Sequence, residues 1–322
     1  MNNYLKTIKT FFEQFAYEPE IINKNKLIRK DKAIIAGMGG SRLAGDILRM
    51  WKPDKEITIH SDYGLPLLSK KNLDDSFIIA NSFSGNTEEI IDVAMKAVEN
   101  NLSLAIVATG GKLLDIAKEN NLPYIQIPSL ALQPRMSLGY SILALLKILG
   151  DDEAFNEAGF LKTLSNIEKL ENQGREISEK MKGKIPLIYT SERNNELGYV
   201  WKIVLNETAK TPAFCNRFPE LNHNEIAGFE NQELSKQFHF LFLRDADDDI
   251  TGRIGLRMNK LKEIFSQKDL SVTQIELNGE SHLKKIFSAI ILAYWTAYYL
   301  ADQYEVDPEK IEIIENFKRI LK

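Results

Sequence analysis

Short apolar runs alternate with segments of helical periodicity along the first half of the chain. Five runs predict strands: "AIIA" (33–36), "EITIHSD" (56–62), "FIIA" (77–80), "SLAIVAT" (103–109) and "YIQIPS" (124–129). The segments between them repeat apolar residues every three to four positions, as amphipathic helices do. Because strands that alternate with helices usually pair in parallel, this half predicts a mostly parallel sheet covered on both faces.

The second half of the chain repeats this order of strand, turn and helix. Its expected strands are "IPLIYT" (185–190), "FHFLFLRD" (238–245) and "SVTQIEL" (271–277), and its expected helices lie at 160–182, 197–210 and 252–265. We therefore expect an α/β fold of two doubly wound, mostly parallel-sheet modules, 1–150 and 151–322, with helices on both faces of each sheet. The polar segment "GDDEAFNEAG" (150–159) is the expected boundary between them.

Composition narrows the class of protein. The 322 residues carry a formal net charge of −4 and 41 scattered lysines and arginines, which argues against a nucleic-acid partner. The single cysteine, Cys215, excludes an internal disulfide and fits a reducing compartment. The longest apolar region, 286–300, is shorter than the roughly 20 residues of a membrane span and predicts a buried helix. The start, "MNNYLKTIKTFFEQF", lacks the apolar core of a signal peptide, so we expect a soluble, cytoplasmic protein without a membrane partner.

The stretch "ANSFSGNTEEIIDVA" (80–94) joins an expected strand to an expected helix through a turn rich in hydroxyl groups. Ser82, Ser84 and Thr87 supply donors, Gly85 lets the backbone come close, and the first amides of a helix have no internal partners. Such a turn suits an anion, most often a phosphate. The alternative is an ordinary helix N-cap, because serine and threonine just before "EE" are typical of helix starts. The turn alone favours neither interpretation.

The glycine turn "GMGGS" opens the first expected helix of this module. Gly37 and Gly39 fit the first two positions of the dinucleotide fingerprint, but the third position is Arg42, which obstructs the close helix packing that a glycine allows. The other interpretation is that Gly39, Gly40 and Ser41 present backbone amides to a smaller polar ligand. Because such turns lie at the carboxyl ends of the strands, we expect both turns to face one crevice.

Six motifs, in order along the chain, resemble a known family: "GMGGSRLAGD", "NSFSGNTEE", "ATGGKL", "PRMSLGYS", "LNETAKTPAF" and "ELNHNEIAGFE". The sequence is similar to the bifunctional phosphoglucose/phosphomannose isomerases, which are built from two sugar isomerase (SIS) domains. The resemblance implies an isomerase that interconverts glucose 6-phosphate, and mannose 6-phosphate, with fructose 6-phosphate. It implies proton transfer through a cis-enediol without a metal or other cofactor, and a 6-phosphate held by Ser82, Ser84 and Thr87.

Glu207 is the candidate base. On the expected helix 197–210 the apolar stripe includes Val200 and Val204, and Glu207 falls about 20° from Val200 when each residue turns by about 100°. Partial desolvation at the margin of the buried face would make its carboxylate a stronger base. A glutamate in this position is more often a solvated flank, but the segment "NETAK" matches the family's catalytic segment and favours the base.

Three further side chains complete the expected catalytic set. Arg135 follows Pro134 at a helix start and would stabilise a developing enediolate; a surface ion pair is the alternative. His223 lies in "PELNHNEIAG", and the resemblance implies that it opens the sugar ring and comes from the neighbouring subunit of a homodimer. A metal site with His223 and Glu225 as ligands is the alternative, but "HNE" lacks the helical HExxH spacing of zinc sites. Lys318 matches the family lysine that assists at the ring oxygen, and its spacing from "VDPEK" favours it over Lys310.

Two interpretations from other classes stay open. SIS domains also occur in regulatory proteins, so a non-catalytic sugar-phosphate sensor is one alternative, although a pure binder has no need of Glu207, Arg135 and His223 together. A nicotinamide enzyme that uses the Gly37 turn is the other. The segment "PEKIEII" leaves the residue that accepts the mannose epimer unidentified, so mannose activity is less firmly implied than glucose activity. The remaining histidines are expected to be structural: His60, His239 and His282.

Overall fold

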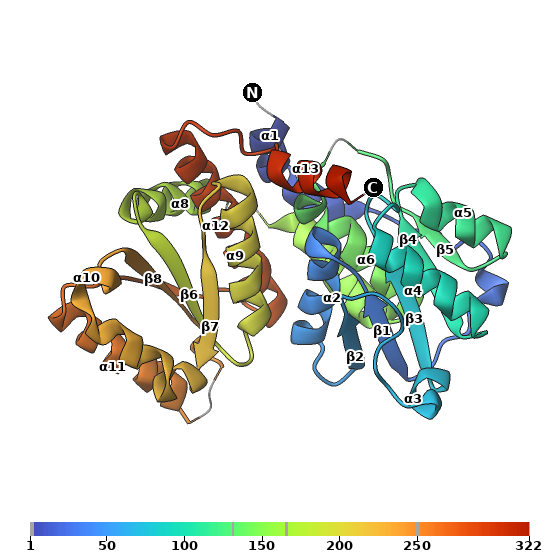
Figure 1. Ribbon diagram of the computed structural model, residues 1–322, viewed down its shortest axis with the longest axis horizontal. Helices are drawn as coiled ribbons and strands as arrows, with labels where there is room; N and C mark the ends of the chain where they lie inside the picture. Colours follow the sequence, from blue (N-terminus) through green and yellow to red (C-terminus); the bar gives the residue numbers. More distant parts are fainter. Residues whose placement is uncertain (1–2, 131, 165–166, 249–250, 322) are drawn as a thin grey trace. The chain divides into compact units, whose positions relative to one another are not determined.

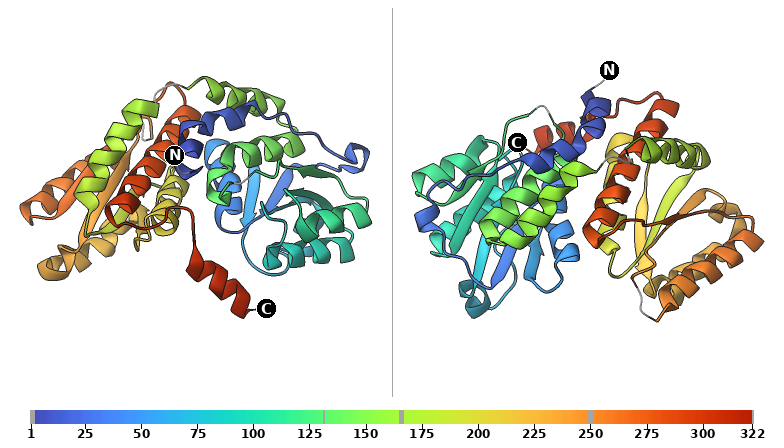
Figure 2. Two further views of the ribbon diagram at one scale, coloured as in Figure 1. Left: turned by 90° about the horizontal axis from the view of Figure 1, so that it is seen from above. Right: turned by 180° about the vertical axis from the view of Figure 1, so that it is seen from behind.

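The computed structural model describes residues 3–130, 132–164, 167–248 and 251–321. The chain divides into two compact units, Thr10–Leu164 and a second made of Met1–Lys9 together with Ser165–Lys322. Each unit contains one parallel sheet with helices on both faces, which confirms the expected α/β fold (Figures 1 and 2).

The segment expected to separate the modules is a helix instead of a linker. Helix α7 (Asp152–Gly159) begins after Asp151, whose side chain accepts a hydrogen bond from the Ala154 amide at 3.0 Å. Ala154 and Ala158 are its buried residues. The expected division at 150/151 therefore falls inside the first unit, which ends at Leu164.

The first unit contains five parallel strands. They are β1 (Lys32–Ala36), β2 (Glu56–His60), β3 (Ser76–Asn81), β4 (Ser103–Ala108) and β5 (Tyr124–Gln126), in the sheet order β2-β1-β3-β4-β5. Its helices, besides α7, are α2 (Gly39–Trp51), α3 (Lys70–Asp74), α4 (Glu88–Glu99), α5 (Gly111–Glu119) and α6 (Leu138–Leu149), with a short 3-10 turn, η3 (Pro134–Met136). Ile34 and Ile78 pack against α4 and α5, while Ile35 projects to the opposite face and meets Gly45 of α2. Both faces of the central strands are therefore buried.

The second unit contains four parallel strands. They are β6 (Ile185–Ser191), β7 (Phe214–Phe218), β8 (Phe238–Arg244) and β9 (Ser271–Glu276), in the order β7-β6-β8-β9. Its helices are α1 (Asn3–Lys9), α8 (Ile167–Met181), α9 (Asn195–Thr208), α10 (Gln232–Ser235), α11 (Arg253–Gln267), α12 (His282–Gln303) and α13 (Glu312–Ile320), with the 3-10 turns η5 (Glu220–His223) and η6 (Glu225–Glu230). Tyr189, Phe240 and Phe242 form one buried cluster with Phe265 of α11. The apolar region expected as a buried helix is the middle of α12.

The two sheets share one topology. In each, the first strand is central, the second lies on one side of it, the third on the other side, and the fourth lies beyond the third. This order confirms the expected duplication. In open sheets of this order, ligands bind at the carboxyl ends of the first and third strands, where the direction of winding reverses. We call this place the switch point of each sheet.

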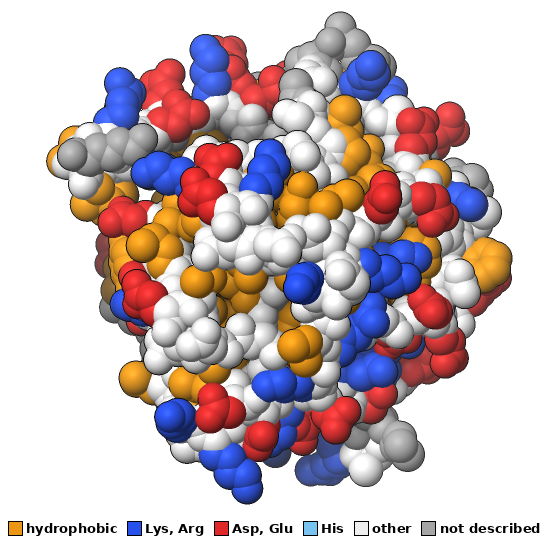
Figure 3. Space-filling model, turned by 90° about the vertical axis from the view of Figure 1, so that its right-hand side faces the viewer, with side chains coloured by type: hydrophobic (Ala, Val, Ile, Leu, Met, Phe, Trp, Pro, Cys, Tyr) orange, Lys and Arg blue, Asp and Glu red, His pale blue; other side chains and the backbone are white. Residues whose placement is uncertain are grey.

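The surface carries no single dominant charge on the face shown in Figure 3, where lysine and arginine side chains are interspersed with aspartate and glutamate. This agrees with their scattered positions along the sequence. Within the described residues, no helix is both long and apolar enough to cross a bilayer.

Candidate active site

The two turns singled out in the sequence meet at the switch point of the first sheet. One follows β1 and the other follows β3, the two neighbouring central strands. The amide of Phe83 donates to Ser41 Oγ at 2.8 Å, and Asn81 Nδ2 donates to the Ser41 carbonyl at 2.8 Å. Ser41 therefore joins the turns, and both lie at the same edge of the sheet.

Two helices, α2 and α4, start at this edge without a side-chain cap. Their N-cap residues, Met38 and Thr87, make no side-chain cap hydrogen bond. Helix α5 starts at the same edge, but its Lys112 amide donates to Asn86 Oδ1 at 3.2 Å and its Leu113 amide donates to the Gly85 carbonyl at 3.0 Å. In α7 of the same unit, by contrast, Asp151 does make one. The first amides of a helix need an outside acceptor, and oxyanions serve well. The alternative that the hydroxyl-rich turn is an ordinary N-cap is therefore wrong for the Thr87 side chain.

The Thr87 hydroxyl pairs with Ser82 instead of capping the helix. Ser82 Oγ and Thr87 Oγ1 lie 2.8 Å apart, and the Gly85 amide donates to Ser82 Oγ at 3.2 Å. One hydroxyl of the pair donates to the other, so the second keeps its hydrogen for a ligand. Ser84 is exposed, and its Oγ accepts from the Asn86 amide at 3.2 Å. These groups supply the donors that an anion requires.

Two glycines allow the loops of this site to touch. Gly85 has a φ of 66°, and a Cβ placed on it would lie 1.7 Å from the Gly110 carbonyl oxygen. A Cβ on Gly40 would lie 2.5 Å from the Arg135 amide nitrogen. The turn after β3 therefore packs on the turn before α5, and α2 packs on η3.

Only part of the glycine turn can offer amides to a ligand. The Ser41 amide donates to the Met38 carbonyl at 3.0 Å, so it is already used inside the turn. Gly39 and Gly40 are the first two residues of α2, where amides have no intrahelical acceptor. The amides that this turn can offer to a ligand are therefore those of Gly39 and Gly40. Ser41 mainly holds the second turn in place through its hydrogen bonds to Phe83 and Asn81.

Arg135 is buried in η3, directly beside the start of α2. Its side chain is 0% exposed, so the alternative of a surface ion pair is wrong. A buried guanidinium is stable only when its charge is compensated by acceptors or anions. The first unit therefore brings Gly39, Gly40, Ser41, the Ser82–Thr87 turn and Arg135 into one connected group of loops.

Glu207 lies on the last turn of α9, in the second unit. Val200, Val204 and Thr208 are buried, whereas Glu207 is half-buried, as the helical periodicity indicates. Hydrogen bonds on both sides of Glu207 fix the end of α9. Asn206 Oδ1 accepts from the Ala213 amide at 2.9 Å, and Lys210 Nζ donates to the Glu207 carbonyl at 2.5 Å. The conformation of the "NETAK" segment thus holds Glu207 at the edge of the core.

His223 and Lys318 are both exposed in the second unit. His223 ends η5 and lines a surface hollow of about 630 Å³ between η5–η6 and α11. Lys318 lies on α13, which has no buried residue. The structure places Glu207, His223 and Lys318 on three different elements of this unit.

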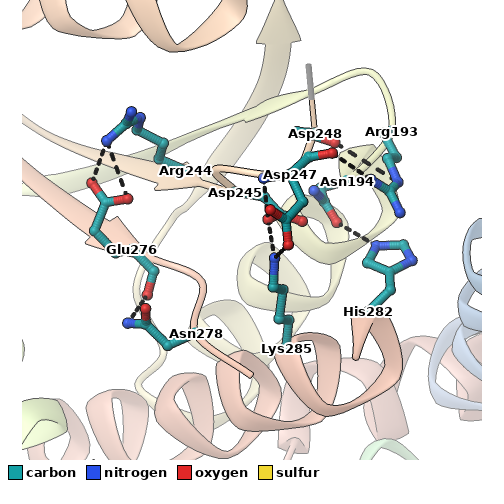
Figure 4. Close-up of polar contacts among 10 residues, drawn as sticks. All are labelled: Arg193, Asn194, Arg244, Asp245, Asp247, Asp248, Glu276, Asn278, His282 and Lys285. Carbon is teal, nitrogen blue, oxygen red and sulfur yellow. Dashed lines mark hydrogen bonds and ion pairs between the residues drawn. The ribbon is translucent and has the colours of Figure 1, made fainter. Parts of the chain in front are cut away.

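The switch point of the second sheet is occupied by charged side chains of the protein itself (Figure 4). Lys285 Nζ donates to Asp245 Oδ1 and to Asp247 Oδ2, each at 2.5 Å, and His282 Nε2 lies 3.1 Å from Asn194 Oδ1. Burial, reinforced by the Asp245 carboxylate, raises the pKa of Asp248. The cations of this cluster, Lys285 and Arg193, are already paired with its aspartates, so of the two switch points the first is the one suited to a phosphate.

Sequence reasoning missed one polar arrangement of the second unit. Glu225 accepts hydrogen bonds from Tyr189 of β6 and Asn216 of β7. The motif "HNE" drew attention to Glu225 as a metal ligand only, and among the described residues no group of side chains suited to a metal is found. The signal in the sequence was the position of Glu225 two residues after the candidate histidine His223, which could have indicated that Glu225 helps to position this histidine.

Comparisons with known proteins agree with this fold. The model of the bacterial phospho-glucose isomerase C-terminal SIS domain matches residues 170–321. The structure is similar to the C-terminal domain of glucosamine-fructose-6-phosphate aminotransferase from Francisella tularensis, with a TM-score of 0.69 at 13% identity, over 95% of this chain and 98% of that chain. Two parallel α/β units and the matched domain define a protein of the SIS class.

Sequence relatives identify the family within this class. The chain is 32% identical to the bifunctional phosphoglucose/phosphomannose isomerase of Aquifex aeolicus (strain VF5), over 100% of this chain and 99% of the relative. It is 35% identical to the protein of the same name from Caldicellulosiruptor bescii, over 89% of each chain. The chain belongs to the bifunctional phosphoglucose/phosphomannose isomerase family, which confirms the resemblance seen in its motifs.

Proposed function

We propose that this protein interconverts glucose 6-phosphate and mannose 6-phosphate with fructose 6-phosphate. Family membership supports the reaction class. The observation that carries the proposal is the first switch point, where α2 and α4 begin without side-chain caps beside the Ser82–Thr87 hydroxyl pair. Helix amides and hydroxyls together match the oxygens of a phosphate ester.

In this proposal the first unit holds the substrate. Ser82, Ser84 and Thr87 bind the 6-phosphate, and the amides of Gly39 and Gly40 contact the polar part of the sugar. Arg135 compensates the negative charge that develops on the enediolate oxygens, because a fixed guanidinium in a desolvated site stabilises such charge strongly.

The proton transfers belong to the second unit. His223 and Lys318 exchange protons with the ring oxygen and the anomeric hydroxyl, so that the ring C–O bond breaks and an open-chain carbonyl forms. Glu207 then removes the C2 proton of the aldose while the C1 oxygen gains a proton, which gives the cis-enediol. Return of a proton to C1 and loss of the C2 hydroxyl proton give the ketose. These steps require no metal and no redox cofactor.

The proposal includes a cytoplasmic homodimer in which His223 acts on the substrate of the neighbouring subunit. The exposure of His223 supports it, because an exposed imidazole needs a second surface before it can work in a desolvated site. The mixed charge of the surface in Figure 3 and the single unpaired cysteine are compatible with it.

The test is Glu207→Gln, with Glu196→Gln as the control on the same helix. Both glutamates are half-buried on α9. Glu207→Gln is expected to lower kcat by about 10²-fold or more and to abolish exchange of the C2 proton with solvent, while fructose 6-phosphate binding persists. Glu196→Gln is expected to keep turnover. Full turnover by Glu207→Gln would refute the assignment of the base.

The non-catalytic sensor is separated from the isomerase by one assay. A coupled assay of fructose 6-phosphate formation from each aldose epimer, with and without a chelator, measures activity and metal dependence together. Micromolar binding of hexose 6-phosphates without any turnover would favour the sensor. Titration with NAD tests the nicotinamide alternative directly.

A further inference from the structure

The Glu225 carboxylate is tied to two neighbouring strands of the second sheet. Tyr189 Oη donates to Glu225 Oε1 at 2.5 Å, and Asn216 Nδ2 donates to Oε2. Tyr189 of β6 and Asn216 of β7 are register partners, and register partners on parallel strands project from the same face of the sheet. Each carboxylate oxygen is therefore bound by a different strand.

The two donors to Glu225, Tyr189 and Asn216, are both held in place by their surroundings. Tyr189 is 0% exposed and packs against Phe218 and Phe242, which fixes its ring. Burial, with the Glu225 carboxylate nearby, raises the pKa of Tyr189, so its hydroxyl keeps its proton. The side chain of Asn216 is oriented by a second hydrogen bond, because its Oδ1 accepts from the Arg217 amide at 2.8 Å. A buried hydroxyl that lost its acceptor would be destabilising, which makes the tie to Glu225 strong.

Glu225 lies two residues after His223. On the other side of His223, Leu221 is buried at 0% exposure in the same aromatic cluster as Tyr189. Between these two anchors Asn224 is held to Glu220, since its Nδ2 donates to Glu220 Oε1 at 2.9 Å. The backbone that carries His223 is thus fixed within two residues on each side, while the imidazole itself stays exposed.

We propose that Glu225 is the positioning residue for His223, and this inference rests on the proposed function. Both carboxylate oxygens of Glu225 are engaged by the sheet, so it acts through the η5–η6 segment and not on the substrate. A catalytic group displaced by about 1 Å loses up to ~10²-fold in rate, so anchoring of this segment has a direct kinetic effect.

The test compares Glu225→Ala with Glu225→Gln on two substrates. Fructose 6-phosphate must open its ring, whereas 5-deoxyfructose 6-phosphate cannot close a furanose because it lacks the C5 hydroxyl. Exchange of the C1 proton into deuterated water is followed by NMR for both. Glu230→Ala, an exposed glutamate of the same 3-10 turn, is the control.

Glu225→Ala is expected to lower kcat for fructose 6-phosphate by about 10-fold to 100-fold with little change in KM, and to leave exchange on the acyclic analogue within about twofold. Glu225→Gln is expected to lose less activity than Glu225→Ala, because its amide oxygen can still accept from the Tyr189 hydroxyl, so that only the tie to Asn216 is lost. In a His223→Ala background, Glu225→Ala should cause no further loss.

Several outcomes would overturn the inference. An equal loss on both substrates would mean that Glu225 supports the whole site, and a Glu225→Gln variant as slow as Glu225→Ala would mean that its charge is what matters. If Glu225→Ala does not fold, Tyr189→Phe removes one of the two ties and should show the same substrate difference at smaller size; no difference would refute the role. A wild type that exchanges neither substrate would refute the proposed function itself.

Discussion

Gly85→Ala is the substitution whose effect follows most directly from the geometry of the Ser82–Thr87 turn. The added Cβ would lie 1.7 Å from the Gly110 carbonyl oxygen, where real contacts are not shorter than 3.0 Å, so the two loops must separate by 3.0 − 1.7 = 1.3 Å. The φ of 66° adds about 1–2 kcal/mol for an alanine in the left-handed region. Overpacking adds about 1–3 kcal/mol.

The total cost for Gly85→Ala is about 2–5 kcal/mol, which is smaller than the typical stability of a domain, about 5–15 kcal/mol. We therefore expect the variant to fold, with a melting temperature lowered by roughly 4–20 °C. The displaced turn carries Ser82 and Thr87, so kcat/KM for fructose 6-phosphate is expected to fall by up to ~10²-fold. Thermal unfolding by calorimetry and initial-rate kinetics measure the two effects.

Gly183→Ala is the matched control for Gly85→Ala. Gly183 has a φ of 73° and no atom within 4 Å of its added Cβ, so it isolates the cost of the left-handed backbone. It should lose about 1–2 kcal/mol and keep its kinetic constants. If Gly85→Ala keeps wild-type kcat/KM, or loses no more stability than Gly183→Ala, the close packing of the two turns is not required for the site.

Two other predictions concern stability and the glycine turn. Desolvation, with the charges of Lys180 and Lys184, lowers the pKa of the buried His239 from 6.5 to about 4. Between pH 6.5 and 4 the imidazole is therefore protonated in the unfolded chain and neutral in the folded chain. His239 should therefore contribute a loss of about 3 kcal/mol in stability as the pH drops from about 6.5 to 4, measured as the difference in urea unfolding between the wild type and His239→Gln; a His239→Gln variant with an unchanged pH profile would contradict this. Gly40→Ala should lower kcat and strongly lower the melting temperature, because its Cβ meets backbone at 2.5 Å. Gly39→Ala meets no atom within 4 Å and carries only the left-handed cost of about 1–2 kcal/mol at its φ of 51°, so it should lower the melting temperature less and mainly raise KM; a larger loss of melting temperature in Gly39→Ala would contradict this.

The sequence was sufficient for the parts of the fold that repeat a local pattern. Buried strands such as β3 and β8 consist mainly of apolar residues. The turns after β1 and β3 are recognisable by their glycine and hydroxyl residues. The edge strand β7 was missed because Phe214 is exposed and polar residues follow it, which leaves no apolar run. The segment of helix α7 was predicted to be the boundary between the modules, because its residues are mostly polar and small and only its two alanines are buried.

For the candidate site, residue types were easier to predict than contacts. The family motifs supplied Glu207 and His223, and helical periodicity placed Glu207 at the edge of the core. The burial of Arg135 was not visible, because it depends on α2 lying against η3 through a glycine. The bond from Tyr189 to Glu225 spans 36 residues of sequence and joins strand β6 to the turn η6, so the local sequence pattern does not reveal it.

The absence of side-chain caps on α2 and α4 has a practical consequence for handling the protein. Sulfate or inorganic phosphate in a buffer would occupy the same amides as the substrate and raise the melting point by mass action. Kinetic constants obtained in such salts would describe competition with the buffer, so chloride or a zwitterionic buffer is the appropriate medium for affinity measurements.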